Sequence, residues 1–207
     1  MNIIELLISF GFLMVAMSIH EFAHGWMADK LGDHTARYSG RLTLNPFAHI
    51  DLIGTVLLPL FIFIASGGRF VFGSAKPVPI NYWALRNPKR DLIWVGLSGP
   101  LANLIFAFLM TFLIRLFIIP FIPRFTFIFF RLILINVVLC VFNLLPIPPL
   151  DGSRILIGIL PPEFVNKYIR IEPYGFFIIM LMFFLGIFDI ILWPIVRIII
   201  GFLRITF

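Results

Sequence analysis

The run His20-Glu21-Phe22-Ala23-His24 contains the residues best suited to chemistry. In a helix, two histidines four positions apart project from one face, one turn apart. Their imidazole nitrogens can then reach a single Zn²⁺ at about 2.0–2.1 Å each. Glu21 follows the first histidine directly, so its carboxylate is placed to take a proton from water that the metal has activated. This spacing predicts a zinc hydrolase with His20 and His24 as ligands and Glu21 as the acid–base group.

A catalytic zinc also needs a third protein ligand and an open fourth position. Asp151 stands out, because it ends the run Asn143-Leu-Leu-Pro-Ile-Pro-Pro-Leu-Asp151 directly after an apolar segment. The prolines end that helix, so the chain can turn a carboxylate back toward the bundle, and Gly152 permits close backbone packing beside it. Other candidates for the third ligand remain open: Asp29, Asp33, His34, His49, Asp51 and Glu163.

The composition indicates that these residues lie in a membrane protein. Of 207 residues, 61% are hydrophobic and only 13% charged, and the mean hydropathy is +1.07. Soluble domains are usually about one quarter charged. The length fits one domain, residues 1–207, and the lack of any basic soluble module excludes nucleic-acid binding. The single cysteine, Cys140, lies in an apolar run and is best explained as a small buried hydrophobe.

Apolar segments predict an all-α polytopic membrane protein, with about five to six transmembrane or re-entrant helices around the zinc site. Residues 3–28, 92–119 and 125–145 are each long enough to span. Residues 52–65 are too few to span straight and contain Gly54 and Pro59, which favours a re-entrant or broken helix. The loop after them allows a small strand pair near residues 69–72. Residues 174–207 form one helix, or two broken near Asp189 and Pro194.

Basic residues discriminate between two topologies. If residues 52–65 re-enter, eleven Lys and Arg residues share one side of the membrane and three lie opposite. Asp151 then emerges on the same side as His20 and His24. The positive-inside rule assigns the eleven to the cytoplasm. They are Lys30, Arg37, Arg41, Arg69, Lys76, Arg86, Lys89, Arg90, Arg154, Lys167 and Arg170; the three are Arg115, Arg124 and Arg131.

Some polar residues in apolar surroundings have two interpretations. Asn103 and Asn143 can each hydrogen-bond a substrate backbone or the oxyanion at the scissile carbonyl, or can join helices to one another. Asn136 is better explained as a contact between helices. His49 and Asp51 fit a turn that caps the next segment better than they fit a ligand pair.

Three motifs together resemble the site-2 protease family of intramembrane zinc metalloproteases, in a compact subgroup without PDZ or CBS domains. They are His20 to His24, Ser98-Gly99-Pro100-Leu101-Ala102-Asn103, and the run from Asn143 to Gly152. The resemblance implies that His20, His24 and Asp151 bind one Zn²⁺ per chain and that Glu21 is the catalytic acid–base. It also implies that Asn143 assists at the active site. The metal would lie within the membrane near its cytoplasmic face.

The predicted function is therefore zinc-dependent hydrolysis of peptide bonds in or near transmembrane segments of membrane-anchored proteins. The expected location is the plasma membrane of a prokaryote. One alternative is a metalloprotease of another family, with Glu163 as its third ligand. A second is a non-proteolytic zinc-binding scaffold or transporter component, against which the intact Glu21 argues. The natural substrate, the cleavage site and the oligomeric state stay open.

Overall fold

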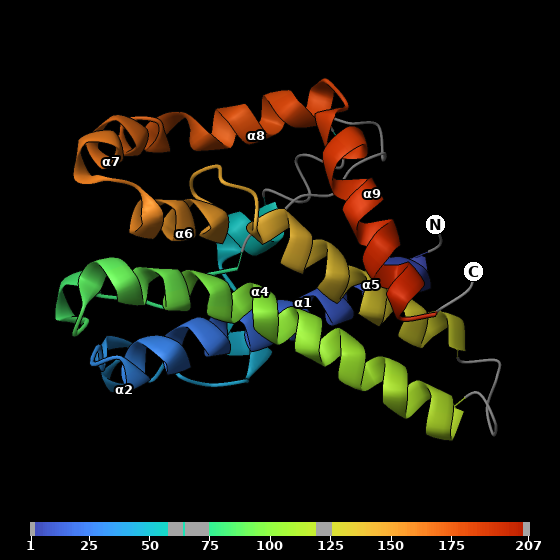
Figure 1. Cartoon of the computed structure of the whole chain (residues 1–207). Coiled ribbons are helices and arrows are strands. Elements are labelled where there is room, and N and C mark those ends of the chain that lie inside the picture. Colours follow the sequence, from blue (N-terminus) through green and yellow to red (C-terminus); the bar gives the residue numbers. More distant parts are fainter. Residues whose placement is uncertain (1–2, 58–63, 65–74, 119–125, 205–207) are drawn as a thin grey trace.

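Helices make up the regular structure of this chain. The computed structural model describes residues 3–57, 64, 75–118 and 126–204, and every regular element in those ranges is helical (Figure 1). The all-α prediction is confirmed for these ranges. The strand pair expected near residues 69–72 lies outside the described residues, as does half of the segment 52–65 expected to re-enter.

The first long helix, α1 (Ile3–Lys30), carries the His-Glu-His motif within its length. Its 28 residues extend about 42 Å at 1.5 Å per residue. Gly32 ends it with a φ of +112°, a conformation that favours glycine. The Asp33 N–H then donates to the carbonyl of Ala28 at 2.9 Å and closes the last turn. Because α1 continues past the predicted end at Ala28, His24 lies on a regular helix with a further turn after it.

The second long helix, α4 (Pro88–Leu113), is the centre of the packing. It begins four residues before the predicted start at residue 92, because Pro88 suits a first helical position and Asp91 accepts the Asn87 N–H at 2.8 Å. It packs against α1, α5 (Thr126–Asn143) and α6 (Asp151–Ile159). The helices that carry the histidines and Asp151 therefore share one neighbour.

Two helical stretches are long and apolar enough to cross a membrane, Leu7–Lys30 and Pro88–Phe117. A third span results if the stretch Pro162–Phe184 and the helix Ile187–Phe202 count as one broken pair, bent by 83°. The apolar stretch Ile128–Asn143 of α5 is shorter. Within the described ranges, the structure thus supports two or three spans, and the predicted number of five to six is not confirmed.

The C-terminal apolar region forms two helices, α8 (Gly175–Phe184) and α9 (Ile187–Phe202), which meet at a sharp bend in Figure 1. The break falls at Gly186, whose φ of +68° favours glycine. Asp189 lies in the first turn of α9, and its N–H donates to the Gly186 carbonyl at 3.1 Å. Of the two predicted alternatives, one helix or two broken near Asp189 and Pro194, the structure has two helices. Pro194 itself lies inside α9, as apolar helices tolerate.

Shorter elements complete the chain. The connection between α5 and α8 holds two short helices, α6 and α7 (Pro162–Ile169). The main apolar core lies between α4, α5, α8 and α9. The remaining elements are α2 (Thr35–Tyr38) and the turns Pro46–His49, Leu52–Leu57, Tyr82–Ala84, Ile114–Ile118 and Glu172–Tyr174.

Close approach of α6 to α4 depends on glycine and yields a stability prediction. A Cβ at Gly158 would lie 2.8 Å from the Lys89 carbonyl oxygen. We expect Gly158→Ala to force the helices apart and destabilise the protein by about 1–3 kcal/mol, the usual effect of overpacking. Thermal unfolding in detergent measures this. Gly201→Ala is the control, because its Cβ would meet nothing within 4 Å. Equal melting temperatures for the two variants would contradict this account of the α4–α6 contact.

Candidate metal centre

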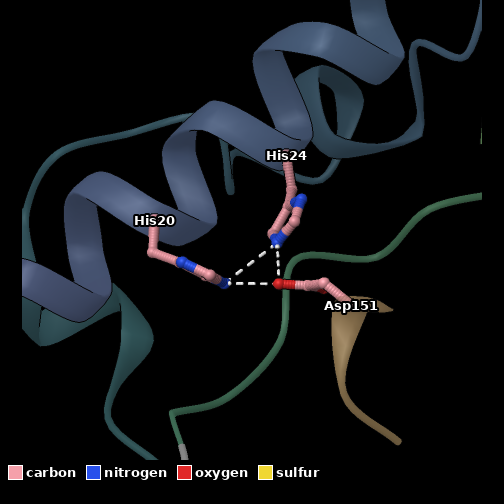
Figure 2. Close-up of side chains that lie close together, drawn as sticks. All are labelled: His20, His24 and Asp151. Atoms are coloured by element: carbon pink, nitrogen blue, oxygen red, sulfur yellow. Dashed lines mark hydrogen bonds and ion pairs between the residues drawn. The ribbon is translucent and has the colours of Figure 1, made fainter. Parts of the chain in front are cut away.

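The three residues His20, His24 and Asp151 converge in space (Figure 2). The two His Nε2 atoms lie 3.0 Å apart. The Asp151 Oδ2 lies 3.0 Å from the Nε2 of His20 and 3.1 Å from that of His24. In the part of the chain that the structure describes, no other group of three His, Cys, Asp or Glu side chains has the geometry to hold a metal ion.

The spacing of these atoms fits a tetrahedral zinc site. Three corners of a tetrahedron with bonds of 2.0–2.1 Å lie about 3.3 Å apart. The observed sides of 3.0–3.1 Å are close to that value. Two nitrogens and one carboxylate oxygen are also a donor set that catalytic zinc sites use, with one position left open. The residues present therefore fit a bound Zn²⁺.

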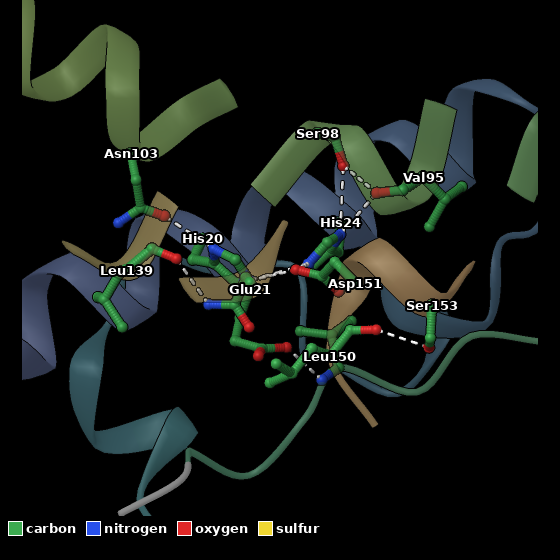
Figure 3. Close-up of polar contacts among 12 residues, drawn as sticks. His20, Glu21, His24, Val95, Ser98, Asn103, Leu139, Leu150, Asp151 and Ser153 are labelled. Carbon is green, nitrogen blue, oxygen red and sulfur yellow. Dashed lines mark hydrogen bonds and ion pairs between the residues drawn. The ribbon is translucent and has the colours of Figure 1, made fainter. Parts of the chain in front are cut away.

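The protonation of both imidazoles follows from their other ring nitrogens (Figure 3). His24 Nδ1 lies 2.7 Å from the carbonyl oxygen of Val95, which can only accept, so this Nδ1 carries the proton. Asn103 donates through Nδ2 to the Ala16 carbonyl at 3.2 Å, which leaves its Oδ1 facing His20 Nδ1 at 2.7 Å. His20 Nδ1 is therefore a donor as well.

In their neutral form, both imidazoles direct a lone pair from Nε2 toward the carboxylate of Asp151. Three electron pairs then converge, an arrangement that repels unless a metal ion or a proton on Nε2 lies between them. His20 and His24 are almost fully buried, so water screens this repulsion poorly. With Nδ1 protonated on both rings, the two Nε2 atoms and the carboxylate are the donor set that a metal ion requires.

Asp151 reaches the histidines because the chain folds back on itself before α6. The Leu150 N–H donates to the Ile147 carbonyl at 2.9 Å, which closes the turn after the prolines. A Cβ at Gly152 would collide with the Leu144 and Leu145 carbonyls, so glycine is required for this close packing. Burial would raise the pKa of Asp151, but the charge and hydrogen bonds of protonated His24 and His20 outweigh burial and hold this pKa well below its usual range. The carboxylate is therefore anionic at neutral pH.

A second glycine lets α4 lie directly against the imidazole rings. A Cβ at Gly99 would lie 2.7 Å from His20 Nε2 and closer still to His24 Nε2. Beside Gly99, the Ser98 hydroxyl donates to the Val95 carbonyl at 2.7 Å. The same carbonyl accepts the hydrogen bond from His24 Nδ1. Small residues of α4 therefore pack directly on the candidate metal centre.

Glu21 is held by a backbone group that the sequence analysis missed. Its Oε2 accepts the Val78 N–H at 2.8 Å. Val78 stands between Pro77 and Pro79, which have no N–H, so it is the only backbone donor among these three residues. Backbone amides carry no side-chain signature, although the alternation Pro-Val-Pro is a local signal of a chain with one free donor.

A cavity of about 480 Å³ opens beside these groups. Its lining includes His20, Glu21 and Asp151 together with Asn143 and Arg154, and its other walls are largely apolar. Asn143 is half-buried and donates to the Leu139 carbonyl at 3.0 Å. It therefore borders the space where a substrate would lie.

Asn103 does not border that space. It is fully buried, and both hydrogens of its amide group are taken, by the Ala16 carbonyl and by Asn136. The interpretation of Asn103 as a substrate or oxyanion contact is wrong, because it has neither access nor a free donor. It joins helices and holds a histidine instead.

The remaining candidates for a third ligand are engaged elsewhere. Asp29 pairs with His34 and Arg37, while Asp33 accepts the Asn81 N–H at 2.7 Å. His49 is buried against the Thr43 carbonyl, Asp51 accepts the Gly54 N–H as a cap, and Glu163 is exposed on α7. Within the described residues, only Asp151 accompanies the two histidines.

Comparison with known proteins identifies relatives of this chain. A model of peptidase family M50 matches residues 121–188. A Bacillus subtilis protein provisionally named zinc metalloprotease YwhC is 38% identical over 189 residues, covering 88% of this chain and 82% of the relative. Mycolicibacterium smegmatis and Mycobacterium tuberculosis proteins, provisionally named zinc metalloprotease Rip2, are 34% and 35% identical over 86% and 72% of this chain. The chain spans 66% and 56% of these two relatives. No solved structure matches it significantly.

The contact of Gly99 with both rings yields a prediction about metal binding. Gly99→Ala leaves every candidate ligand in place but inserts a methyl group against the Nε2 atoms. We expect it to weaken Zn²⁺ binding at least about 10-fold, as the loss of an outer partner of a ligand does. Titration against a chromophoric chelator measures the affinity. Gly11→Ala on α1 is the control, because its Cβ would meet nothing within 4 Å, and equal affinities would contradict the prediction.

Proposed function

Because this chain belongs to peptidase family M50, the site-2 proteases, we propose that it hydrolyses peptide bonds in or near transmembrane segments of membrane-anchored proteins, using Zn²⁺. One observation carries the proposal: two imidazoles and a carboxylate converge at 3.0–3.1 Å on a cavity that Glu21 also lines. A zinc-binding scaffold or transporter component would need no such acid–base group at the cavity, so the protease is the better supported function.

In this proposal His20, His24 and Asp151 hold the zinc ion. When bound, zinc polarises the scissile carbonyl and acidifies a water molecule in the cavity. Glu21 removes a proton from that water and delivers it to the leaving amine nitrogen. Its contact with the Val78 N–H supports this role, because it holds the carboxylate toward the cavity and limits its rotation.

We assign Asn143 a supporting role in the same cavity. One N–H of its side-chain amide donates to the Leu139 carbonyl, and the group lines the cavity beside Glu21. An amide in this position suits a hydrogen bond to the backbone of an extended substrate peptide. Such a peptide must be unwound from its helix, since a helix uses its own backbone groups internally.

The chain is an integral membrane protein, and we infer that the metal centre faces the cytoplasm. The C-terminal end of α1, the start of α4 and the helix α6 come together around this centre. Basic residues gather in these three parts of the helices, among them Lys30, Lys89, Arg90 and Arg154. The positive-inside rule then places this end in the cytoplasm, and the plasma membrane of a prokaryote is the expected location. We also propose that α5 is embedded, since its 18 residues extend about 27 Å.

The identity of the third ligand is tested by zinc content. We expect purified Asp151→Ala to retain far less than one zinc per chain, because it removes one of three converging donors. Glu163→Ala should retain the wild-type amount, since that side chain is exposed on α7. Metal analysis after dialysis measures both. The reverse result would favour a metalloprotease of another family.

The role of Glu21 is tested by activity with the metal retained. We expect Glu21→Gln to bind zinc normally but to lose proteolysis by at least about 100-fold, because an amide cannot accept and return the proton. Comparing the membrane proteomes of cells with wild type and Glu21→Gln should show accumulated substrates. Zinc binding combined with unchanged proteomes, and with no cleavage of membrane proteins by the purified wild type, would favour the scaffold.

A further inference from the structure

Asn136 is a polar side chain that the chemistry described so far does not use. It lies near the middle of α5, is fully buried and does not line the cavity. Its Nδ2 donates to the carbonyl of Leu132 at 2.8 Å, one turn earlier in the same helix. Its Oδ1 accepts from Asn103 Nδ2 at 2.9 Å. A buried amide with both ends engaged is costly to mutate and holds its neighbours in one orientation.

The bonds around Asn136 form a continuous chain to the metal centre. Asn136 accepts a hydrogen bond from Asn103 on α4. The Oδ1 of Asn103 in turn accepts a hydrogen bond from His20 Nδ1 on α1 at 2.7 Å, as Figure 3 shows. The hydrogen bonds of this series all run in one direction: His20 donates to Asn103, Asn103 donates to Asn136, and Asn136 donates to the Leu132 carbonyl. Aligned amide dipoles polarise one another, so each bond strengthens the next.

This direction has a consequence for the ligand. A stronger acceptor at His20 Nδ1 shifts electron density toward Nε2, the atom directed at Asp151. It also fixes the ring plane and excludes the tautomer that would put a proton on Nε2. If Asn136 is removed, one N–H of the Asn103 side chain loses its acceptor, because the Ala16 carbonyl accepts only the other N–H.

We propose that Asn136 is a positioning residue for the zinc ligand His20, acting from a third helix through Asn103. The inference rests on the proposed function, because it takes His20 to be a ligand. The inference goes beyond that function because it assigns α5, which carries Asn136, an effect on zinc affinity in addition to its packing. A residue that only joined helices would affect stability and leave the affinity of a folded protein for zinc unchanged.

A double-mutant cycle on the full chain in detergent tests the proposal, with Zn²⁺ as the probe. We expect Asn136→Leu to weaken zinc binding about 10-fold and Asn103→Leu by about 10- to 100-fold. The double variant should bind no more weakly than Asn103→Leu alone, because Asn136 acts only through Asn103. Thr111→Val is the matched control, since among the described residues this buried α4 hydroxyl bonds only the Ala107 carbonyl. It should keep the wild-type affinity.

Several results would overturn the inference. Wild-type zinc affinity in folded Asn136→Leu would do so, as would losses that multiply in the double variant. If Asn136→Leu does not fold, Asn136→Ser gives the same reading with a smaller, polar side chain. The absorption spectrum of bound Co²⁺ adds an independent readout, since it changes with ligand geometry. Loss of zinc in His20→Ala checks the premise separately: normal binding in that variant would refute the ligand assignment, whatever Asn136 does.

Discussion

Two imidazole Nε2 atoms and a carboxylate are directed at one point inside a low-dielectric helix bundle, and this constraint governs the packing around them. Moving a carboxylate out of water costs several kcal/mol, so Asp151 needs a positive partner, which a metal ion or a protonated imidazole supplies. The fold must therefore keep the donors in place so that the metal does not have to assemble them.

The helix α4 provides most of this restraint, largely because two of its residues are glycines without side chains. Gly99 leaves space for both rings, and Gly96 lets the start of α6 approach, since a Cβ there would lie 3.1 Å from the Asp151 carbonyl oxygen. The same helix supplies an acceptor to each histidine, the carbonyl of Val95 and the side chain of Asn103. One helix therefore orients two candidate ligands and lets the third approach. This explains why Ser, Gly and Ala residues gather in this part of an otherwise bulky sequence.

Sequence reasoning identified the parts of the centre that depend on local spacing. Histidines four residues apart share a helix face wherever the helix lies, and a proline-rich run before Asp151 ends a helix in any context. Groups defined by tertiary contact gave no such signal. The Val78 N–H and the Val95 carbonyl belong to the backbone, and the true role of Asn103 depends on which atom faces His20. The sequence also left open whether residues 174–207 form one helix or two broken near Asp189 and Pro194; the left-handed conformation of Gly186 sets the break.

Hydrolysis of a membrane-embedded peptide requires water and an unwound backbone in the same place, and the cavity brings the two conditions together. Its polar floor lies on α1 and α6, while its apolar walls include Leu139 and Phe176 from α5 and α8. The segment around Val78 forms another wall, and its prolines leave few donors to compete with a substrate. The side chains of an extended peptide would therefore contact apolar walls, and polar groups of the protein would lie near one of its peptide bonds only. In this arrangement Glu21 and the candidate ligands on α1 and α6 would determine where a substrate is cut.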